Sequence, residues 1–230
     1  MLHGYLPSLL HGLALSLGVA LCSLAIAALL GLAGALARLS RSRVAQRIAL
    51  AYTTVIRGVP DLVLMLLVFF GGQLAVNEIA ARLGHEDYID VDPFVAGVLT
   101  IGFIFGAYLS ETFRGAFLAV PAGQREAGLA CGMSRMQVLT RIELPQMLRH
   151  ALPSLSNNWL VLVKSTAIVS VIGLSDLMLR ATQAAGNTRE PFVFYAAAAL
   201  GYLLVTSVSE LGFHLLTRRL ALPSRGARQP

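Results

Sequence analysis

Residues 7–37 read PSLLHGLALSLGVALCSLAIAALLGLAGALA, and His11 is the only one of them that can carry a charge near neutral pH. A helix needs about 20 predominantly apolar residues to cross the hydrocarbon core of a bilayer, so this run is long enough to span it. The first four residues of the chain include no lysine or arginine, and the apolar run is longer than the core of a signal peptide. We therefore expect residues 7–37 to remain as the first membrane anchor.

The chain as a whole is rich in apolar residues. Of its 230 residues 56% are hydrophobic and 13% are charged, whereas a soluble domain carries about 25% charged residues. Backbone polar groups inside lipid must be satisfied within the spanning segment, so the apolar runs are predicted to be helices. The sequence thus predicts an all-α membrane protein with a single transmembrane domain, residues 1–230. Its five predicted spans are residues 7–37, 48–76, 93–118, 152–174 and 192–217.

The basic residues are distributed unevenly between the two sides of the predicted spans. Thirteen of the 18 lysines and arginines fall on one side, and segment 78–92 on the opposite side is acidic. Because positively charged loops stay in the cytoplasm, the N-terminus is predicted to lie outside and the C-terminus inside. Topology therefore explains the net charge of +6, and no nucleic-acid partner is expected. The thirteen residues are Arg38, Arg41, Arg43, Arg47, Arg114, Arg125, Arg135, Arg141, Arg149, Arg218, Arg219, Arg225 and Arg228.

One cytoplasmic segment is amphipathic: residues 126–145, EAGLACGMSRMQVLTRIELP. Gly132 suits the left-handed position after a short helix over residues 126–131. Ser134 and Gln137 have the spacing of a capping box, which predicts a second helix up to about residue 143. Pro145 should end that helix because proline lacks the backbone N–H.

The second helix would carry an apolar stripe formed by Met136, Leu139 and Ile142. Two interpretations fit such a stripe. It can dock onto a cytoplasmic partner, or the helix can lie flat on lipid headgroups.

Several enzymatic motifs are missing from the sequence. The only lysine is Lys164, and no P-loop of the form G-x-x-x-x-G-K-[ST] surrounds it. Zinc-protease and nucleophile-elbow motifs are also missing. We therefore expect no catalytic residue, no metal site and no cofactor bound by this chain.

Charged residues inside a membrane are costly and mark functional sites. Arg57 and Asp61 flank Gly58-Val59-Pro60 in the second predicted span, where Pro60 should kink or break the helix. Broken helices often build transporter sites, so both residues are candidates for the substrate pathway. Alternatively, Arg57 and Asp61 pair with each other and hold the kink.

The fourth predicted span is the most polar of the five. Lys164 lies about 12 residues into it, which corresponds to a depth of about 18 Å. Lys164 is therefore either part of the substrate pathway or a pairing partner for another helix or subunit. Glu111 and Arg114, three residues apart near the end of the third span, favour a surface ion pair. The pathway candidates in span four are Asn157, Asn158, Lys164, Ser165 and Thr166.

Segment 126–145 also carries a family resemblance. Its pattern E-A-x-x-x-x-G, nine residues, then I-x-L-P resembles the EAA signature of binding-protein-dependent ABC importer permeases. Gly128 departs from it, since a third alanine is usual there. The resemblance implies that this segment is the coupling helix that binds the ATPase subunit. The coupling residues would be Glu126, Ala127, Gly132, Met136, Leu139, Ile142, Leu144 and Pro145.

Further stretches resemble polar amino-acid permeases of the histidine/lysine-arginine-ornithine type, with octopine and arginine permeases as near relatives. They include YTTVIRGVPDLVLMLLVFFG (52–71) and LPSLSNNWLVLVKSTAIVSVIGLSDL (152–177). This resemblance implies a type I ABC importer permease core in a bacterial inner membrane. Implied partners are two copies of an ATP-binding subunit that holds ATP and Mg, a periplasmic amino-acid-binding protein, and a second similar permease or another copy of this chain.

The predicted function is passage of polar, basic amino acids through the membrane, coupled to ATP hydrolysis by a partner subunit. One rival is a stand-alone secondary transporter driven by ions through Asp61 or Glu111. Another is a structural subunit whose partner permease holds the only substrate site.

Overall fold

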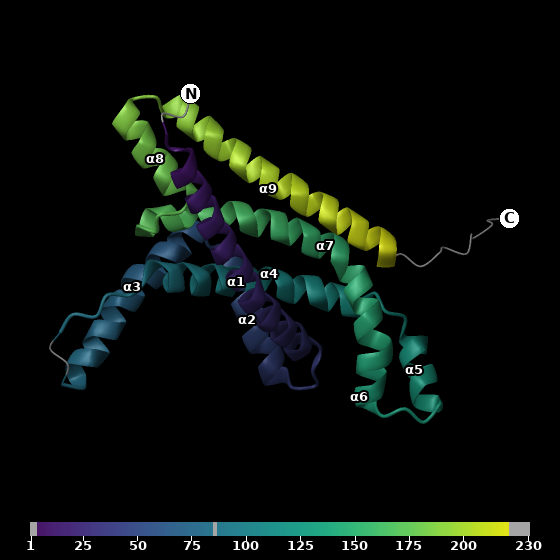
Figure 1. The fold of residues 1–230 in the computed structure, drawn as a ribbon. Coiled ribbons are helices and arrows are strands. Elements are labelled where there is room, and N and C mark those ends of the chain that lie inside the picture. The colour runs from purple at the N-terminus through teal and green to yellow at the C-terminus, as the bar shows by residue number, and fades with distance from the viewer. Residues whose placement is uncertain (1–3, 85–86, 221–230) are drawn as a thin grey trace.

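The computed structural model describes residues 4–84 and 87–220 (Figure 1). Within these ranges every regular element is helical. Two of the arginines named above, Arg225 and Arg228, and Glu86 of the acidic segment 78–92 lie outside the described residues. The elements are α1 (Leu6–Leu39), α2 (Arg43–Gly58), α3 (Asp61–Arg82), α4 (Pro93–Leu118), α5 (Ala122–Ala130), α6 (Arg135–Val138), the π-helix η1 (Leu139–Glu143), α7 (Leu144–Ser165), the 3₁₀-helix η2 (Thr166–Ile172), α8 (Leu177–Thr188) and α9 (Pro191–Leu220).

Five helical stretches in the described part are long and apolar enough to cross a membrane, which confirms the predicted all-α architecture. They differ greatly in how much of their surface the chain itself covers. In the apolar window of α4, 67% of the residues are buried, whereas only 11% are buried in that of α3. Figure 1 shows α3 leaving the bundle. The stretches are Leu6–Leu39, Asp61–Arg82, Pro93–Leu118, Arg135–Ile172 and Pro191–Arg219.

The second predicted span, residues 48–76, is divided into two helices at the position where the sequence predicts a kink or break. Val59 and Pro60 have extended backbone conformations, with ψ of 137° and 135°, so the chain forms α2 and α3 separately. Pro60 has no N–H to donate to α2, and the ring disfavours a helical conformation for Val59. The break predicted at Pro60 is therefore confirmed, but only α3 has the length and composition of a membrane span.

The predicted end of the helix at Pro145 is wrong. Helical structure continues without interruption from Arg135 to Ile172. A π-turn, η1, comes directly before the proline, and the N–H of Leu144 donates to the carbonyl oxygen of Leu139, five residues earlier. A π-turn carries one residue more than an α-turn, and the displaced carbonyl leaves space for the proline ring. The helix that contains the fourth predicted span thus begins before residue 152.

The core is built where α1 packs closely against α4, the most extensive helix contact of the described chain. A methyl group added at Gly31 would lie 2.6 Å from the Cβ of Leu109, and one at Gly102 would lie 2.8 Å from the Cβ of Ile26. Both distances are too short for two carbon atoms, so glycine is required at this crossing. α7 packs on another side of α4, where Asn158 Nδ2 donates to Thr112 Oγ1 at 2.9 Å.

α8 closes the opposite end of the bundle from the α5–α6 hairpin and packs against α1 and α9 (Figure 1). Asp176 caps it: its Oδ1 accepts from the N–H of Leu179 at 2.8 Å. The Asp176 side chain is fully buried, and burial raises its pKa to about 6.

Topology can be tested by labelling engineered cysteines. Asp87 and Gln137 lie on opposite sides of the predicted spans, and both are exposed. In a variant with Cys22 and Cys131 replaced by serine, a cysteine at Asp87 should react with a membrane-impermeant thiol reagent in intact cells. A cysteine at Gln137 should react only after permeabilisation, because most of the basic residues lie on its side. The reverse pattern would show that the chain is inserted the other way.

Candidate functional site

Two helices and a tight turn form a hairpin that projects from the bundle (Figure 1). After α5, Gly132 takes the left-handed conformation with φ of +81°, as predicted from the sequence. The N–H of Met133 donates to the carbonyl oxygen of Gly128 at 3.1 Å, and that of Gly132 donates to Leu129 at 3.0 Å. These two bonds define a Schellman motif, which satisfies the free carbonyls at the end of the helix.

The second arm of the hairpin starts with the predicted capping box. Ser134 Oγ accepts from the N–H of Gln137 at 3.3 Å, and Gln137 Oε1 accepts from the N–H of Ser134 at 2.8 Å. The end of α5 and the start of α6 are thus both capped, only a few residues apart, and this fixes the angle between the two arms.

The coupling candidates lie along both arms of this hairpin, on different faces. Glu126 and Ala127 are exposed on α5. Met136 is 66% exposed, whereas Leu139 and Ile142 are half-buried. The predicted stripe is therefore not one open face. Of the last two candidates, Leu144 is half-buried at the start of α7, and Pro145 next to it is exposed.

Gly128, where the chain departs from the EAA signature, lies at the contact between the two arms. A methyl group there would come within 2.7 Å of Ile142 Cδ1 and 3.1 Å of Val138 Cγ2. Ile142 thus occupies the space that an alanine side chain would need. The missing methyl group lets the arms approach more closely, at a cost of about 1 kcal/mol in helix propensity.

The substrate-pathway candidates do not converge on one place. Arg57 lines a cavity of about 490 Å³ between α1, α2 and α4, with its guanidinium carbon 5.4 Å from the centre of the Tyr108 ring. No ion pair joins Arg57 to Asp61 in the described structure, so the alternative of a pair that holds the break is not realised. Asp61 is half-buried at the start of α3 and does not line this cavity.

The candidates in the fourth span have separate surroundings. Lys164 lines an apolar cavity of about 320 Å³ beside α9. Thr166 is buried and donates to the carbonyl oxygen of Val163 at 2.7 Å. Asn158 binds Thr112, whereas Asn157 is exposed and Ser165 half-buried.

The cavity at Arg57 also contains residues that the sequence analysis did not assign to the substrate pathway. Glu111 forms the predicted ion pair with Arg114, with Nη2 and Oε2 2.8 Å apart. Arg38 approaches the other carboxylate oxygen to 3.8 Å from α1, so Glu111 joins two helices. In the sequence, the only indication of this contact is that Arg38 is basic and lies near the end of the first predicted span. Its pairing with Glu111 can be predicted only when α1 and α4 are known to be neighbours. The cavity is lined by Arg38, Leu50, Thr53, Thr54, Arg57, Gly58, Tyr108 and Glu111.

Fold and site together define a polytopic helical membrane protein whose third and fourth spans are joined by a doubly capped hairpin. The chain belongs to the family of binding-protein-dependent transport system inner membrane components, whose model matches residues 27–222. Membership confirms the family resemblance of segment 126–145. It also identifies the chain as an inner-membrane permease of an ABC transporter.

Similar proteins extend over nearly the full chain. The histidine/lysine/arginine/ornithine transport system permease protein HisQ of Salmonella typhimurium is 51% identical over 223 residues, 96% of this chain and 97% of that protein. HisQ of Escherichia coli K12 is 49% identical over the same shares. The octopine transport system permease protein OccQ of Rhizobium radiobacter is 40% identical over 94% of this chain and 91% of its own length.

Solved structures agree with the fold. An amino acid ABC transporter crystallised with histidines has 32% sequence identity and a TM-score of 0.79, over 94% of this chain and 95% of that one. A chain of the inward-facing MetNI methionine ABC transporter has a TM-score of 0.80 at 17% identity, over 96% of this chain and the whole of that one. The second similarity supports the fold alone.

The left-handed turn at Gly132 can be tested by substitution. Nothing lies within 4 Å of a methyl group placed there, so any effect comes from the positive φ. Gly132→Val should distort the hairpin at a cost of at least about 1–2 kcal/mol, and Gly132→Asn should retain most of the function because asparagine tolerates this conformation. We expect uptake to be lost in the valine variant while the chain still inserts in the membrane.

Gly123→Val is a matched control, because Gly123 lies in α5 without a positive φ and also has open space around it. Uptake by the Gly132→Val variant equal to that of this control would show that the turn does not matter.

The contact at Gly128 makes a second prediction. Gly128→Ala restores the usual family residue but forces Ile142 Cδ1 to move, whereas the double variant with Ile142→Val lacks that atom. We expect the double variant to be more thermostable than Ile142→Val alone, by up to about 1 kcal/mol from helix propensity. The single Gly128→Ala variant should gain less. Equal gains in both backgrounds, measured by thermal unfolding in detergent, would contradict the packing described here.

Proposed function

We propose that this chain is the transmembrane permease subunit of an importer for polar amino acids with basic side chains: histidine, arginine, lysine, ornithine or a related opine. The observation that carries the proposal is identity of about one half, over 96% of the chain, to permeases named for histidine, lysine, arginine and ornithine. Relatives named for octopine and arginine support the same class. All of these compounds combine a carboxylate with a cationic group.

The chain would transport without catalysing a reaction. It contains no P-loop, so ATP and Mg would be bound and hydrolysed by two copies of a partner ATPase subunit. The other proposed partners are a periplasmic amino-acid-binding protein and a second permease, either similar to this chain or a second copy of it. The alternative of a stand-alone ion-driven transporter is rejected, because members of the family work with a binding protein.

In the proposed mechanism, the hairpin receives the movement of the ATPase subunits. Glu126 has no ion-pair partner within the described residues and is exposed, so it is free to bind the ATPase. The second arm continues from Arg135 into α7, with helical structure up to Ile172 and a bend between α6 and α7 (Figure 1). Displacement of the hairpin therefore acts on α7 where it packs against α4, and α4 carries Tyr108 and Glu111 of the Arg57 cavity.

The Arg57 cavity suits a basic amino acid better than the other candidate positions do. Its guanidinium can bind a substrate carboxylate through two parallel hydrogen bonds. The Tyr108 ring in the same cavity can face a cationic side chain, whereas the Glu111 carboxylate is already bound by Arg114 and Arg38. Asp61, at the start of α3, remains a further candidate for the cationic group.

Transport by the reconstituted complex tests this proposal. Proteoliposomes with the ATPase, the second permease and the binding protein should take up basic amino acids in an ATP-dependent way. Losing one charged hydrogen bond costs roughly 1.5–3 kcal/mol, so Arg57→Gln or Asp61→Asn should raise the half-saturating substrate concentration by about 10- to 100-fold if the residue contacts substrate. Assembly should remain normal in both variants.

Arg82→Gln is the control, because Arg82 is exposed and paired with Glu78 at the far end of α3. If the half-saturating substrate concentration is unchanged in both Arg57→Gln and Asp61→Asn, neither residue contacts the substrate, and the contacts must lie in the partner permease. ATP-dependent uptake of only neutral or acidic amino acids would refute the proposed substrate class itself.

A further inference from the structure

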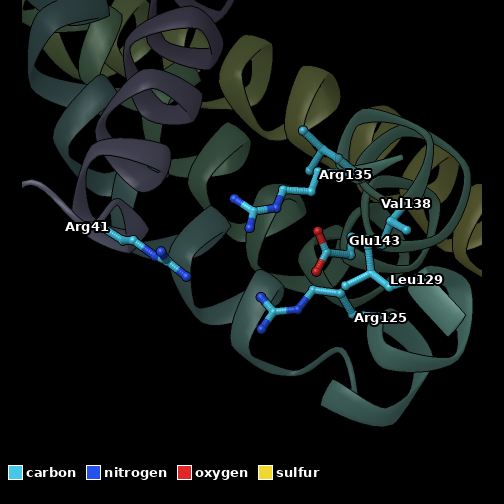
Figure 2. Close-up of a pocket in the computed structure, with 7 residues that line it drawn as sticks. Arg41, Arg125, Leu129, Arg135, Val138 and Glu143 are labelled. Carbon is cyan, nitrogen blue, oxygen red and sulfur yellow. The ribbon is translucent and has the colours of Figure 1, made fainter. Parts of the chain in front are cut away.

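A second hollow lies beside the hairpin and is lined mainly by charged residues. It has a volume of about 390 Å³, which is within the range of small-ligand sites. Figure 2 shows Arg41, Arg125 and Arg135 with their guanidinium groups directed toward the same space. They come from three different elements: the turn between α1 and α2, α5, and α6. Leu129 and Val138 contribute apolar surface.

The three arginines of this hollow have no acidic partner within the described residues, although they lie close together. Arg82 and Arg114 form close ion pairs with Glu78 and Glu111. Within the described residues, no carboxylate lies within 4 Å of Arg41, Arg125 or Arg135. Glu143 also lines the hollow but pairs with none of them, which leaves two excess positive charges. The positive-inside rule accounts for arginines on this side of the membrane, but not for their convergence.

An apolar groove lies between the two helices that the same turn connects. It has a volume of about 420 Å³ and is bounded by α1, α2 and α4. Among its lining residues, Ala37 and Ala45 lie four residues before and after Arg41. On α2, Val44 and Ile48 are 67% and 66% exposed, which is the pattern of a helix surface in contact with lipid. Other lining residues are Ala33 and Phe103.

We propose that these two features form a site for one anionic phospholipid, independent of the substrate and of the proposed function. The phosphate of the headgroup would bind Arg41, Arg125 and Arg135 in charge-assisted hydrogen bonds. An acyl chain would lie in the groove between α1 and α2. Pockets of basic residues at the cytoplasmic ends of membrane helices suit anionic headgroups, and each arginine near the surface contributes about fivefold in affinity.

The groove is the reason to choose a lipid over other anions. Inorganic phosphate would use the arginines but leave the apolar surface at Ala33 and Phe103 unused. An acidic side chain of a protein partner would likewise reach only the polar part. A phospholipid has both an anionic and an apolar part. Arg41 lines the polar hollow, and Ala37 and Ala45, on either side of its turn, line the groove.

Native mass spectrometry of the complete transporter complex in detergent can test the site, with phosphatidylglycerol, phosphatidylethanolamine and inorganic phosphate as probes. We expect phosphatidylglycerol to bind more tightly than phosphatidylethanolamine. The double variant Arg41→Gln/Arg135→Gln should weaken the binding of phosphatidylglycerol about 25-fold, at about fivefold for each arginine. Ala33→Phe should also weaken the binding of phosphatidylglycerol, because the larger side chain fills the groove. Leu29→Phe, on the exposed side of α1, should leave that binding unchanged.

The matched charge control is Arg141→Gln/Arg149→Gln, which removes two exposed arginines of the same segment outside the hollow. An equal loss of affinity for phosphatidylglycerol in this control would show that the lipid is attracted by the overall positive charge and not by this hollow, which would overturn the proposal. If inorganic phosphate at a comparable concentration displaces the lipid, the arginines form a site for a free anion and the lipid proposal is wrong. Failure of the complex to bind phosphatidylglycerol, with the chain alone still binding it, would show that the ATPase covers the hollow. If the glutamine variants fail to assemble, Ala33→Phe decides the outcome alone.

Discussion

The contact between α1 and α4 is the packing interaction on which the other elements depend. Lipid is as apolar as leucine, so helices in a bilayer associate through close van der Waals contact, and small residues allow that closeness. Gly31 and Gly102 leave no space for a side chain between the two helices. Once joined, α1 and α4 offer separate faces to the remaining elements. α2 and α7 pack on this pair, and α1 also holds α8 at the other end of the bundle.

The same pair connects the two candidate sites. Arg38 of α1 and Glu111 of α4 meet at the cavity that contains Arg57, while the turn after α1 carries Arg41 of the arginine-lined hollow. The hairpin reaches the pair through α7, which packs on α4. In the proposed mechanism, movement at the hairpin and occupation of either hollow would act on the same two helices. This arrangement gives the permease a mechanical basis for the coupling proposed above.

Local features were predictable from the sequence because they depend on neighbouring residues. The left-handed Gly132, the Ser134 capping box and the break at Pro60 follow from backbone rules that apply within a few positions. Continuation of the helix through Pro145 was missed, since it depends on a π-turn that has no simple sequence signature. The Arg57 cavity was only partly predicted. Its Glu111 and Arg38 lie 73 positions apart, and only the packing of α1 on α4 brings them together.

The π-turn at η1 also limits how this segment can change in evolution. Residues 139–143 contain one residue more than an α-helical turn needs, so a deletion there would restore a regular helix. Because the wider turn accommodates the extra residue locally, the helix on either side keeps nearly the same phase with or without it, and Met136 would keep its direction. A deletion in the regular part of α7 would instead rotate the hairpin by about 100° relative to the remainder of α7, since an α-helix has 3.6 residues per turn. The segment therefore tolerates a change in length at the π-turn but not in the α-helix that follows it.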